Sequence, residues 1–380
     1  MTRLVVTGAG VLSPAGIGLQ SLAAQISGHR GVPRSRSLDA GALCTEGPPD
    51  AIFNAVADFD VRQFLGRKGT AALDRQSALA VVACGQALED SGLCVNDDNR
   101  DRIGVALGTS WGSLKSISDF VKESLLADRP YLVTPTHFPN TVLNCAAGQS
   151  AIRYGLRGIN ATVAGGRIAF LNALEYAANA LRCGHADSML TGAAEELTAH
   201  TAWAIHASRQ EAKPTIVGEA AASFVIESFD AASACSRHVD IEVLSVSTGF
   251  CPGSRKPERV SACLDGCIRG VLKEAELGAR DVTCVATCEA AGADDLHHGI
   301  ESRAVAAVFG QTQVERIAIG SIFGECLAAT GALQMGVMLA LHRAHPRRDG
   351  QFSVMTGITR DGGYGAAVLR GWCRRGPNRP

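Results

Sequence analysis

The sequence predicts an α/β protein built from two similar halves, because the same order of elements occurs twice along the chain. A helix expected over residues 77–93 is followed by a buried strand at residues 102–108 that ends in a Gly-rich turn. The order returns in the second half, where a helix expected within residues 259–282 precedes the strand and turn of residues 283–292. The strands are short, apolar and unalternating, as in RLVVTG, IGVALG and VMTG, which indicates sheets covered on both faces.

A second pair of segments supports the duplication. The helix expected over residues 168–183 leads into a strand within residues 186–196, and the helix expected over residues 327–344 leads into a strand within residues 352–363. Both strands contain a Thr-Gly pair. Helices that alternate with strands predict β-α-β units, right-handed crossovers and mostly parallel sheets.

The length of 380 residues exceeds what a single core usually supports, so we expect the halves to be residues 1–235 and 236–380. The least regular segments are residues 30–50, 119–139 and 208–217. We expect these segments to form surface or interface loops.

Charge and composition exclude several classes of function. The 36 Lys and Arg residues balance 37 Asp and Glu residues, which leaves a formal net charge of -1 and no net basic field to attract nucleic acid. The N-terminal segment has a short apolar run broken by Gly8 and Gly10, unlike a signal or transit peptide. No run approaches the ~18 to 20 apolar residues that span a bilayer. These features predict a cytoplasmic protein without a membrane or nucleic-acid partner.

The 13 cysteines are an odd number spread over the whole chain, and they favour buried thiols over a disulfide framework. A metal site is the alternative at the pairs spaced i,i+4 and at the histidines after them, namely Cys263 and Cys267, Cys284 and Cys288, and His297 and His298. Zinc ligands usually lie on loops as two-residue knuckles, whereas these cysteines lie in apolar runs, so packing is the favoured interpretation and no metal is expected.

Two further motifs each allow another function. GTSWG (residues 108–112) matches the nucleophile elbow of a serine hydrolase, in which Ser110 would need partners such as Asp294 and His297. Gly8, Gly10 and Gly18 resemble a dinucleotide-binding turn. However, a proline stands where the helix should begin, and no acidic residue follows a second strand for the ribose.

Several segments carry a resemblance to a known family. They are HFPNTVLNCAAGQSAIRYGLRGINATV (residues 137–163), LRCGHADSMLTGAAEE (181–196), VGEAAASFVIES (217–228) and LAATGALQ (327–334), preceded by VVTGAGVLSPAGIG and AALDRQSALAVVACGQALEDSGL. In this order, over nearly the whole chain, they resemble the β-ketoacyl-[acyl carrier protein] synthases of fatty acid and polyketide assembly. The resemblance implies the thiolase fold, in which two duplicated halves form five α-β-α-β-α layers.

That family condenses acyl groups with a cysteine at a helix N-terminus, and two histidines help to decarboxylate the malonyl unit and stabilise its developing oxyanion. The matching positions differ in this sequence. Arg167 stands at the cysteine position in TVAGGRIAF, and Ala291 at the first histidine position in CEAAGADD. In GSIFGECLAATGAL, Glu325 stands at the second histidine position and Gly320 replaces a lysine. The resemblance therefore implies that none of these catalytic positions works.

The turn that gates the acyl pocket in the family is reduced here to RDGGYG, with Asp361, Gly362 and Gly363. Loss of one nucleophile or polarising donor lowers a rate by about two to four orders of magnitude, so the combined losses predict no condensing activity. Cys288 and Cys145 are candidate surrogates, but we expect neither to begin a helix beside a basic partner.

A chain with the fold but without the chemistry resembles the chain length factor, the inactive partner in the heterodimeric ketosynthase of type II polyketide synthases. The resemblance implies a catalytic ketosynthase subunit and an acyl carrier protein as partners, and no cofactor. The acyl tunnel and dimer interface are then expected in residues 131–149, at His137, Phe138, Val142, Leu143 and Cys145. An arginine in place of the usual glutamine and the short loop at residues 208–217 favour the divergent partners of polyene-making synthases.

A buried guanidinium without a partner costs several kcal/mol, and Glu325 shares its pocket in the family. We therefore expect an ion pair between Arg167 and Glu325. Besides the hydrolase, the alternative to a chain length factor is a standalone enzyme on the same fold that uses Glu325, Glu289 or Asp294.

Overall fold

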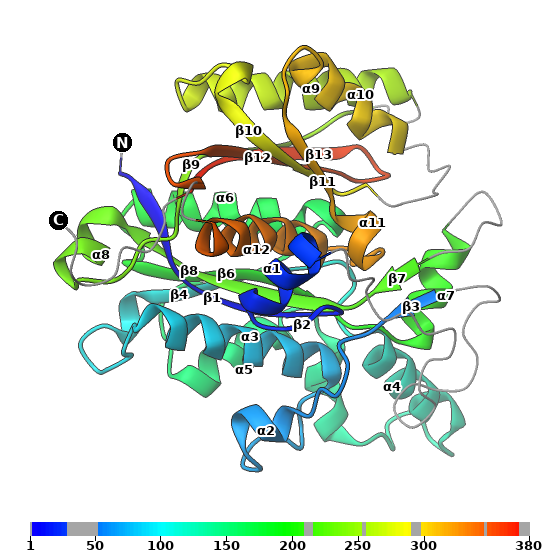
Figure 1. Ribbon diagram of the computed structural model, residues 1–380. Helices are drawn as coiled ribbons and strands as arrows, with labels where there is room; N and C mark the ends of the chain where they lie inside the picture. Colours follow the sequence, from blue (N-terminus) through cyan, green and yellow to red (C-terminus); the bar gives the residue numbers. More distant parts are fainter. Residues whose placement is uncertain are drawn as a thin grey trace.

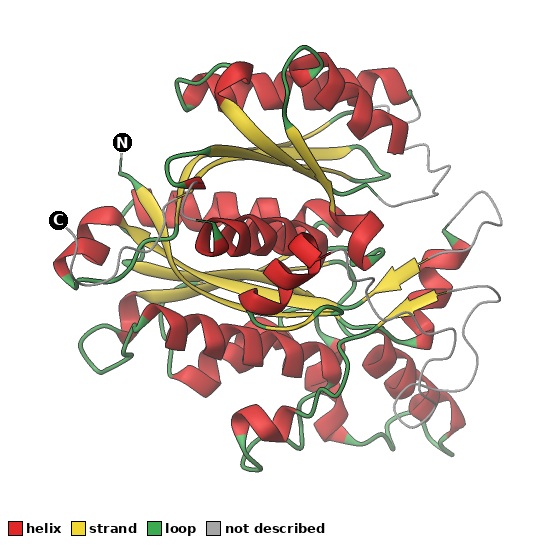
Figure 2. Cartoon of the chain, in the orientation of Figure 1, coloured by secondary structure: helices red, strands yellow, loops and turns green. Residues whose placement is uncertain are grey.

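The structure is a computed structural model that describes residues 2–28, 52–208, 216–252, 256–289, 298–345 and 348–371. Helices and strands stack in five layers in the order helix, sheet, helix, sheet, helix (Figures 1 and 2). The predicted α/β fold class is therefore confirmed. No helix in these ranges is long and apolar enough to cross a membrane.

The strands of the two sheets repeat one arrangement. The first sheet contains β1 (Leu4–Ser13), β4 (Ile103–Thr109), β5 (Asn160–Ala164), β6 (Ser188–Glu195) and β8 (Ala220–Ser228). The second contains β9 (Ile241–Phe250), β10 (Val282–Thr287), β11 (Glu315–Ala318), β12 (Phe352–Ile358) and β13 (Gly363–Gly371). The spatial orders are β1-β8-β6-β4-β5 and β9-β13-β12-β10-β11, and a short β1–β9 pairing joins the sheets. When the strands of each sheet are counted along the chain, the two sheets have the same spatial order. The division of the chain at residue 235 stays a prediction.

Both sheets are mixed: in each, four strands run in one direction, as the prediction of mostly parallel sheets expects, and one strand runs against them, which was not predicted. β4 pairs in parallel with β5 and β6, whereas β8 runs antiparallel to both β6 and β1. In the same way β10 is parallel to β11 and β12, whereas β13 is antiparallel to β12 and β9. The link from β12 to β13 spans only residues 359–362. Such a short connection makes a hairpin, because parallel neighbours need a crossover of about a dozen residues or more.

The helices form three layers, one between the two sheets and one on each outer face. α1 (Leu19–Gly28), α6 (Ala169–Arg182) and α12 (Ala329–Ala344) lie between the sheets (Figure 1). In α12 every residue up to His342 is buried, as its uncharged sequence requires between two sheets. The outer faces carry α3 (Arg75–Ser91) and α5 (Cys145–Tyr154) on the first sheet, and α9 (Pro257–Glu274) and α10 (His298–Phe309) on the second.

The remaining elements complete the described chain. They are β2 (Gly16–Ile17), β3 (Ile52–Asn54), β7 (Ile216–Gly218), α2 (Val61–Leu65), α4 (Leu114–Leu126), α7 (Ala199–Ala207), α8 (Phe229–Ala234), α11 (Ile319–Phe323) and the 3₁₀ helices η1 (Arg100–Arg102), η2 (Pro135–Thr141), η3 (Gly166–Ile168) and η4 (Ala279–Asp281).

Residues 119–139 are more regular than expected, because α4 and η2 occupy most of that segment. Ser113 caps α4, and its side chain accepts a hydrogen bond from the amide of Ser116. The segment at residues 208–217 ends in β7, which pairs in parallel with β3. Residues 30–50 lie outside the described residues.

Candidate functional site

Arg167 and Glu325 lie 158 positions apart in the chain and form a hydrogen-bonded ion pair, as predicted. The Nε atom of Arg167 donates to Glu325 Oε1 and Oε2 at 3.1 and 2.9 Å, and Nη2 also donates to Oε2. The two side chains are 16% and 10% exposed. A charge-assisted, forked contact of this kind neutralises both groups in a place with little solvent.

Arg167 and Glu325 each lie just before the N-terminus of a helix. Arg167 lies in η3, the turn between β5 and α6, where the φ of +55° at Gly166 suits a glycine. The partial positive charge of a helix N-terminus disfavours a cation, so the carboxylate of Glu325 also offsets this repulsion. Glu325 precedes α12, and its Oε1 accepts a hydrogen bond from the amide of Leu327 at 3.0 Å.

Cys288 and Glu301 lie close enough to the ion pair for its charges to affect their pKa values. Burial raises the pKa of the Cys288 thiol well above its ordinary value, so the thiol is protonated at neutral pH and is a poor nucleophile. Burial also raises the pKa of Glu301 to about 8, and this carboxyl accepts hydrogen bonds from the Cys288 amide at 3.1 Å and the Thr356 hydroxyl at 2.6 Å. Cys288 thus lacks the lowered pKa that a surrogate nucleophile would need, while Ala291 lies outside the described residues.

Ser110 has a structural partner among the described residues. Its hydroxyl oxygen accepts a hydrogen bond from the amide of Ala328 at 3.2 Å, one residue before α12 begins. Its own amide donates to the carboxyl of Glu195, whose pKa burial raises to about 8. The proposed hydrolase partners Asp294 and His297 lie outside the described residues. In the described structure, the Ser110 hydroxyl therefore accepts a hydrogen bond from the backbone just before α12.

Cys145 begins α5, which meets one of the two conditions for an activated thiol, a helix start and a basic partner. Its thiol contacts the hydroxyl of Ser77 at 3.5 Å and the amide oxygen of Asn140 at 3.4 Å. Burial, with the nearby carboxylate of Asp74, raises the pKa of this thiol above its usual value. A helix start alone does not activate the thiol, because desolvation and the negative neighbour both disfavour the thiolate.

The cysteines considered as metal ligands lie in separate parts of the second half of the chain. Cys263 and Cys267 lie on α9, whereas Cys284 and Cys288 lie in β10 and directly after it. Within the described ranges, no three His, Cys, Asp or Glu side chains come together in a way that could hold a metal ion. Burial raises the pKa of Cys284 to about 12, as expected of a packed thiol.

Asp361, Gly362 and Gly363 form the turn between β12 and β13, and side chains hold this turn in one shape. The Thr359 hydroxyl donates to the Asp361 carboxylate and accepts a hydrogen bond from the amide of Gly363 at 2.8 Å. The Thr359 methyl group lies only 3.4 Å from where a Cβ on Gly166 would be. The turn therefore packs against the β5-to-α6 turn that carries Arg167.

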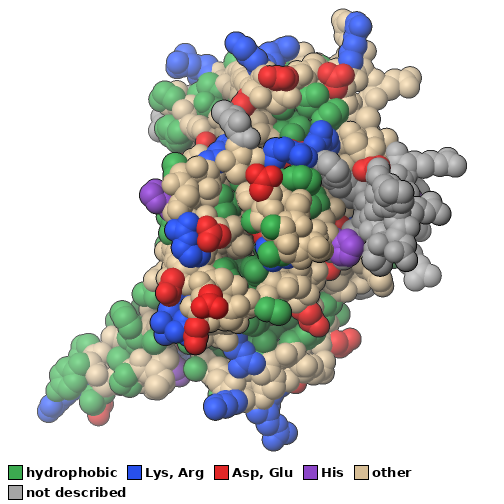
Figure 3. Space-filling model, turned by 90° about the vertical axis from the view of Figure 1, so that its left-hand side faces the viewer, with side chains coloured by type: hydrophobic (Ala, Val, Ile, Leu, Met, Phe, Trp, Pro, Cys, Tyr) green, Lys and Arg blue, Asp and Glu red, His purple; other side chains and the backbone are tan. Residues whose placement is uncertain are grey.

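The expected tunnel and interface residues lie together at one edge of the molecule. His137, Phe138, Val142 and Leu143 are exposed, whereas Cys145 is buried at the end of their segment. We call residues 114–143, which include α4 and η2, the arm. The distant lower part of Figure 1, where α4 lies, projects at lower left in Figure 3 and is largely covered by hydrophobic side chains.

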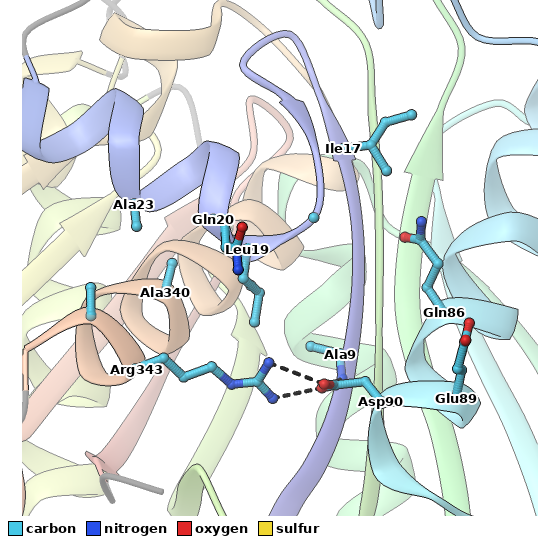
Figure 4. A pocket seen from close by; sticks show the side chains of 12 residues that line it. Ala9, Ile17, Leu19, Gln20, Ala23, Gln86, Glu89, Asp90, Ala340 and Arg343 are labelled. Carbon is cyan, nitrogen blue, oxygen red and sulfur yellow. Dashed lines mark hydrogen bonds and ion pairs between the residues drawn. The ribbon is translucent and has the colours of Figure 1, made fainter.

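A pocket with a volume of about 640 Å³ lies away from the ion pair, between α1, α3 and α12 (Figure 4). Asp90 and Arg343 face each other across it, joined by hydrogen bonds of 3.2 and 2.6 Å. The amide of Ala9, which a bound phosphate would need, donates to Asp90 at 2.9 Å. Because Asp90 and Glu89 would also repel a phosphate, the dinucleotide hypothesis for the N-terminal glycines is not supported.

Comparison with known proteins identifies the family. Residues 1–232, well over half of the chain, match the profile described as "Beta-ketoacyl synthase, N-terminal domain". The chain belongs to the beta-ketoacyl synthase family.

Named relatives and solved structures agree with this assignment. The 3-oxoacyl-[acyl-carrier-protein] synthase 2 of Vibrio cholerae is 35% identical over 195 residues, which is 51% of this chain and 46% of the relative. The protein of the same name from Coxiella burnetii is 27% identical over 87% of this chain and 84% of its own length. The chain thus spans about half the length of the first relative and most of the second.

Two solved structures extend the likeness over nearly the whole chain. "The ishigamide ketosynthase/chain length factor" has a TM-score of 0.84 at 33% identity, over 97% of this chain and 99% of that one. A type II polyketide ketosynthase in complex with its acyl-carrier protein, AntDE:AntF, has a TM-score of 0.77 at 19% identity, over 97% of this chain and 99% of that one, and shows the fold alone. The thiolase-like fold of a ketosynthase is therefore shown.

Sequence reasoning missed one buried acidic pair at the end of β6. Glu195 and Glu196 are each 2% exposed, and burial raises their pKa values to about 8 and about 7. Glu196 accepts hydrogen bonds from the Ser113 hydroxyl at 3.0 Å and the Lys115 amide at 3.3 Å at the start of α4. The signal was present in TGAAEE, where two adjacent carboxyls follow a buried strand.

Proposed function

We propose that this protein is a non-catalytic ketosynthase-like subunit, a chain length factor, which pairs with an active ketosynthase and helps to shape the acyl tunnel. The observation that carries the proposal is the ion pair of Arg167 and Glu325. It occupies the positions at which active family members would carry the nucleophilic cysteine and a polarising histidine.

The chemistry of the pair supports inactivity. A guanidinium is not a nucleophile at any physiological pH, and a carboxylate cannot donate a hydrogen bond to a developing oxyanion. The pair also satisfies its own charges, so neither group is available to bind a thioester. The two cysteines considered as surrogate nucleophiles, Cys288 and Cys145, have raised pKa values, which disfavours the thiolate at neutral pH.

The exposed apolar arm supports pairing with a second subunit. The structural neighbour at 33% identity is itself described as a ketosynthase/chain length factor. In addition, β5 is an edge strand of the first sheet, and it lies beside α5, the helix that follows the arm in the chain. An exposed apolar surface next to the edge strand of a sheet is typical of a protein–protein contact.

A basic surface supports contact with an acidic carrier protein. Arg62, Arg67 and Lys68 are exposed on α2 and the link after it, and Arg153 of α5 is exposed beside them. Arg153 donates to the carbonyl of Leu65 at 2.7 Å, which places α5 against this link. Four cations on one surface attract an acidic partner by long-range electrostatics.

The test is to mix the purified chain with a candidate ketosynthase and a loaded carrier protein. We expect a heterodimer by size exclusion with light scattering, condensation only in the mixture, and an acyl adduct by intact mass only on the ketosynthase. A standalone enzyme using Glu289 or Glu325 would instead turn over substrate by itself. A chain that stays apart from every ketosynthase encoded beside it would contradict the proposal.

A further inference from the structure

The apolar surface of the arm is concentrated and unusually exposed. Eight of the thirteen exposed large hydrophobic side chains in the described part of the chain lie between residues 121 and 143. Leu125 and Leu126 are 78% and 74% exposed, and Tyr131 is 68% exposed. Since contiguous apolar surface of this kind marks protein contacts, the shape of the arm decides what it can bind.

Glu123 of α4 joins the two parts of the arm. Its Oε1 accepts hydrogen bonds from the amide and the hydroxyl of Thr134 at 2.9 and 2.6 Å. Its Oε2 lies 3.5 Å from Nδ1 of His137. Thr134 is the residue directly before η2, so one carboxylate fixes the start of η2 against α4. The Thr134 hydroxyl also lowers the pKa of Glu123, which keeps the carboxylate ionised at neutral pH.

Contacts at the two ends of the arm fix it to the rest of the chain, from the Ser116 hydroxyl to Asp74 at 3.1 Å and from the Asn140 amide to the carbonyl of Ala72 at 2.9 Å, and two more lie within it. The Phe120 and Phe138 rings lie 5.9 Å apart with an interplanar angle of 59°, and the Ser124 hydroxyl donates to the carbonyl of Pro130 at 3.2 Å. Residues 127–133 between α4 and η2 contain no helix or strand. Such a segment is easily disordered, and a surface that must order on binding loses affinity.

We propose that Glu123 is a positioning residue that holds the arm in its binding-competent shape, and that the surface it presents receives the ketosynthase subunit. This inference rests on the proposed function, because the partner is the one proposed there. The Thr134 bonds fold η2 back on α4, so that Phe138 and the exposed leucines are displayed together before the partner arrives. Preorganisation then appears as affinity, without any direct contact between Glu123 and the partner.

The experiment compares Glu123→Ala and Glu123→Gln with Asp119→Ala. Asp119 lies one turn earlier on α4 and pairs with Lys115, so its substitution removes the same charge without touching η2. Hydrogen exchange on the isolated chains and the Kd of the heterodimer are measured. Two hydrogen bonds correspond to roughly a 10- to 100-fold change, so Glu123→Ala should weaken the heterodimer by about that factor. Residues 127–143 should exchange faster, and the melting temperature should barely move.

Glu123→Gln keeps an acceptor for Thr134 and should lie between Glu123→Ala and the unchanged protein, while Asp119→Ala should behave like the unchanged protein. Equal Kd and exchange for Glu123→Ala and Asp119→Ala would overturn the inference. So would faster exchange without weaker binding, because the arm would then not be the docking surface. If the unchanged chain binds no ketosynthase, the proposed function fails, and the exchange of the isolated chain still decides whether Glu123 orders the arm.

Discussion

Arg167→Ala would remove the counter-ion of a carboxylate whose side chain is only 10% exposed. Breaking a buried pair by removing one partner costs roughly 3 to 5 kcal/mol, because the remaining charge is left in a poorly solvated place. Glu325 keeps the hydrogen bond from the Leu327 amide at 3.0 Å and some contact with solvent. We therefore expect a loss near the lower limit, about 3 kcal/mol in the free energy of unfolding.

The loss should depend on pH, because a stranded carboxyl can take up a proton. Without the guanidinium, burial raises the pKa of Glu325, so the loss should be smaller at pH 5 than at pH 8. Replacing both Arg167 and Glu325 by apolar residues of similar volume should recover much of the stability, since no uncompensated charge then remains.

The assay is urea denaturation followed by circular dichroism and by tryptophan fluorescence, with coincident transitions required for a two-state treatment. Arg102→Ala is the matched control, because the Arg102–Asp187 pair is exposed on both sides, at 43% and 63%, and should contribute little. If the single substitutions in the Arg167–Glu325 pair simply add in the double variant, or if Arg167→Ala is as mild as Arg102→Ala, the argument for a buried, coupled pair is refuted.

Three further predictions concern activity, chain length and pH. Arg167→Cys should not restore condensation or yield a stable acyl adduct by intact mass, because the polarising histidines would still be absent, and detectable product from that variant alone would contradict this. Phe138→Ala should shift the partnered enzyme toward longer products, since a two-carbon unit needs about 2.5 Å of tunnel and the removed ring is longer than that; a lower yield of unchanged length, with less heterodimer recovered, would instead identify packing. Burial raises the pKa values of Glu195 and Glu301 to about 8, so the folded state keeps protons that the unfolded state releases above its pKa near 4.5. Stability should therefore fall as pH rises from about 4.5 to 8, by at most about 1.4 kcal/mol per pH unit for each group, and Glu195→Gln should reduce that slope; denaturation curves with the same slope in the variant would exclude Glu195 as a source.

The Arg167–Glu325 pair and Ser110 show which features of the site could be predicted from the sequence and which could not. The Arg167–Glu325 pair was predictable because two opposite charges stand in segments whose neighbours match the family closely, and a buried charge needs a partner. The role of Ser110 was not predictable. GTSWG has the letters of a nucleophile elbow, but the hydroxyl accepts a bond from Ala328, a residue 218 positions away. Nothing local to the motif encodes that contact.

The order of helices and strands, the repeated pattern of the halves and the identities of the residues at positions 167, 291 and 325 were determined by the sequence itself, because periodicity and side-chain type are local properties. The tertiary structure alone decided the mixed direction of the sheets, the helix start at Cys145, the raised pKa of Glu195 and the exposure of the arm. Strand direction depends on which distant strands become neighbours, and burial depends on how completely other layers cover a residue. Both are sums over contacts between residues far apart in the chain, so they exist only once the five layers have packed.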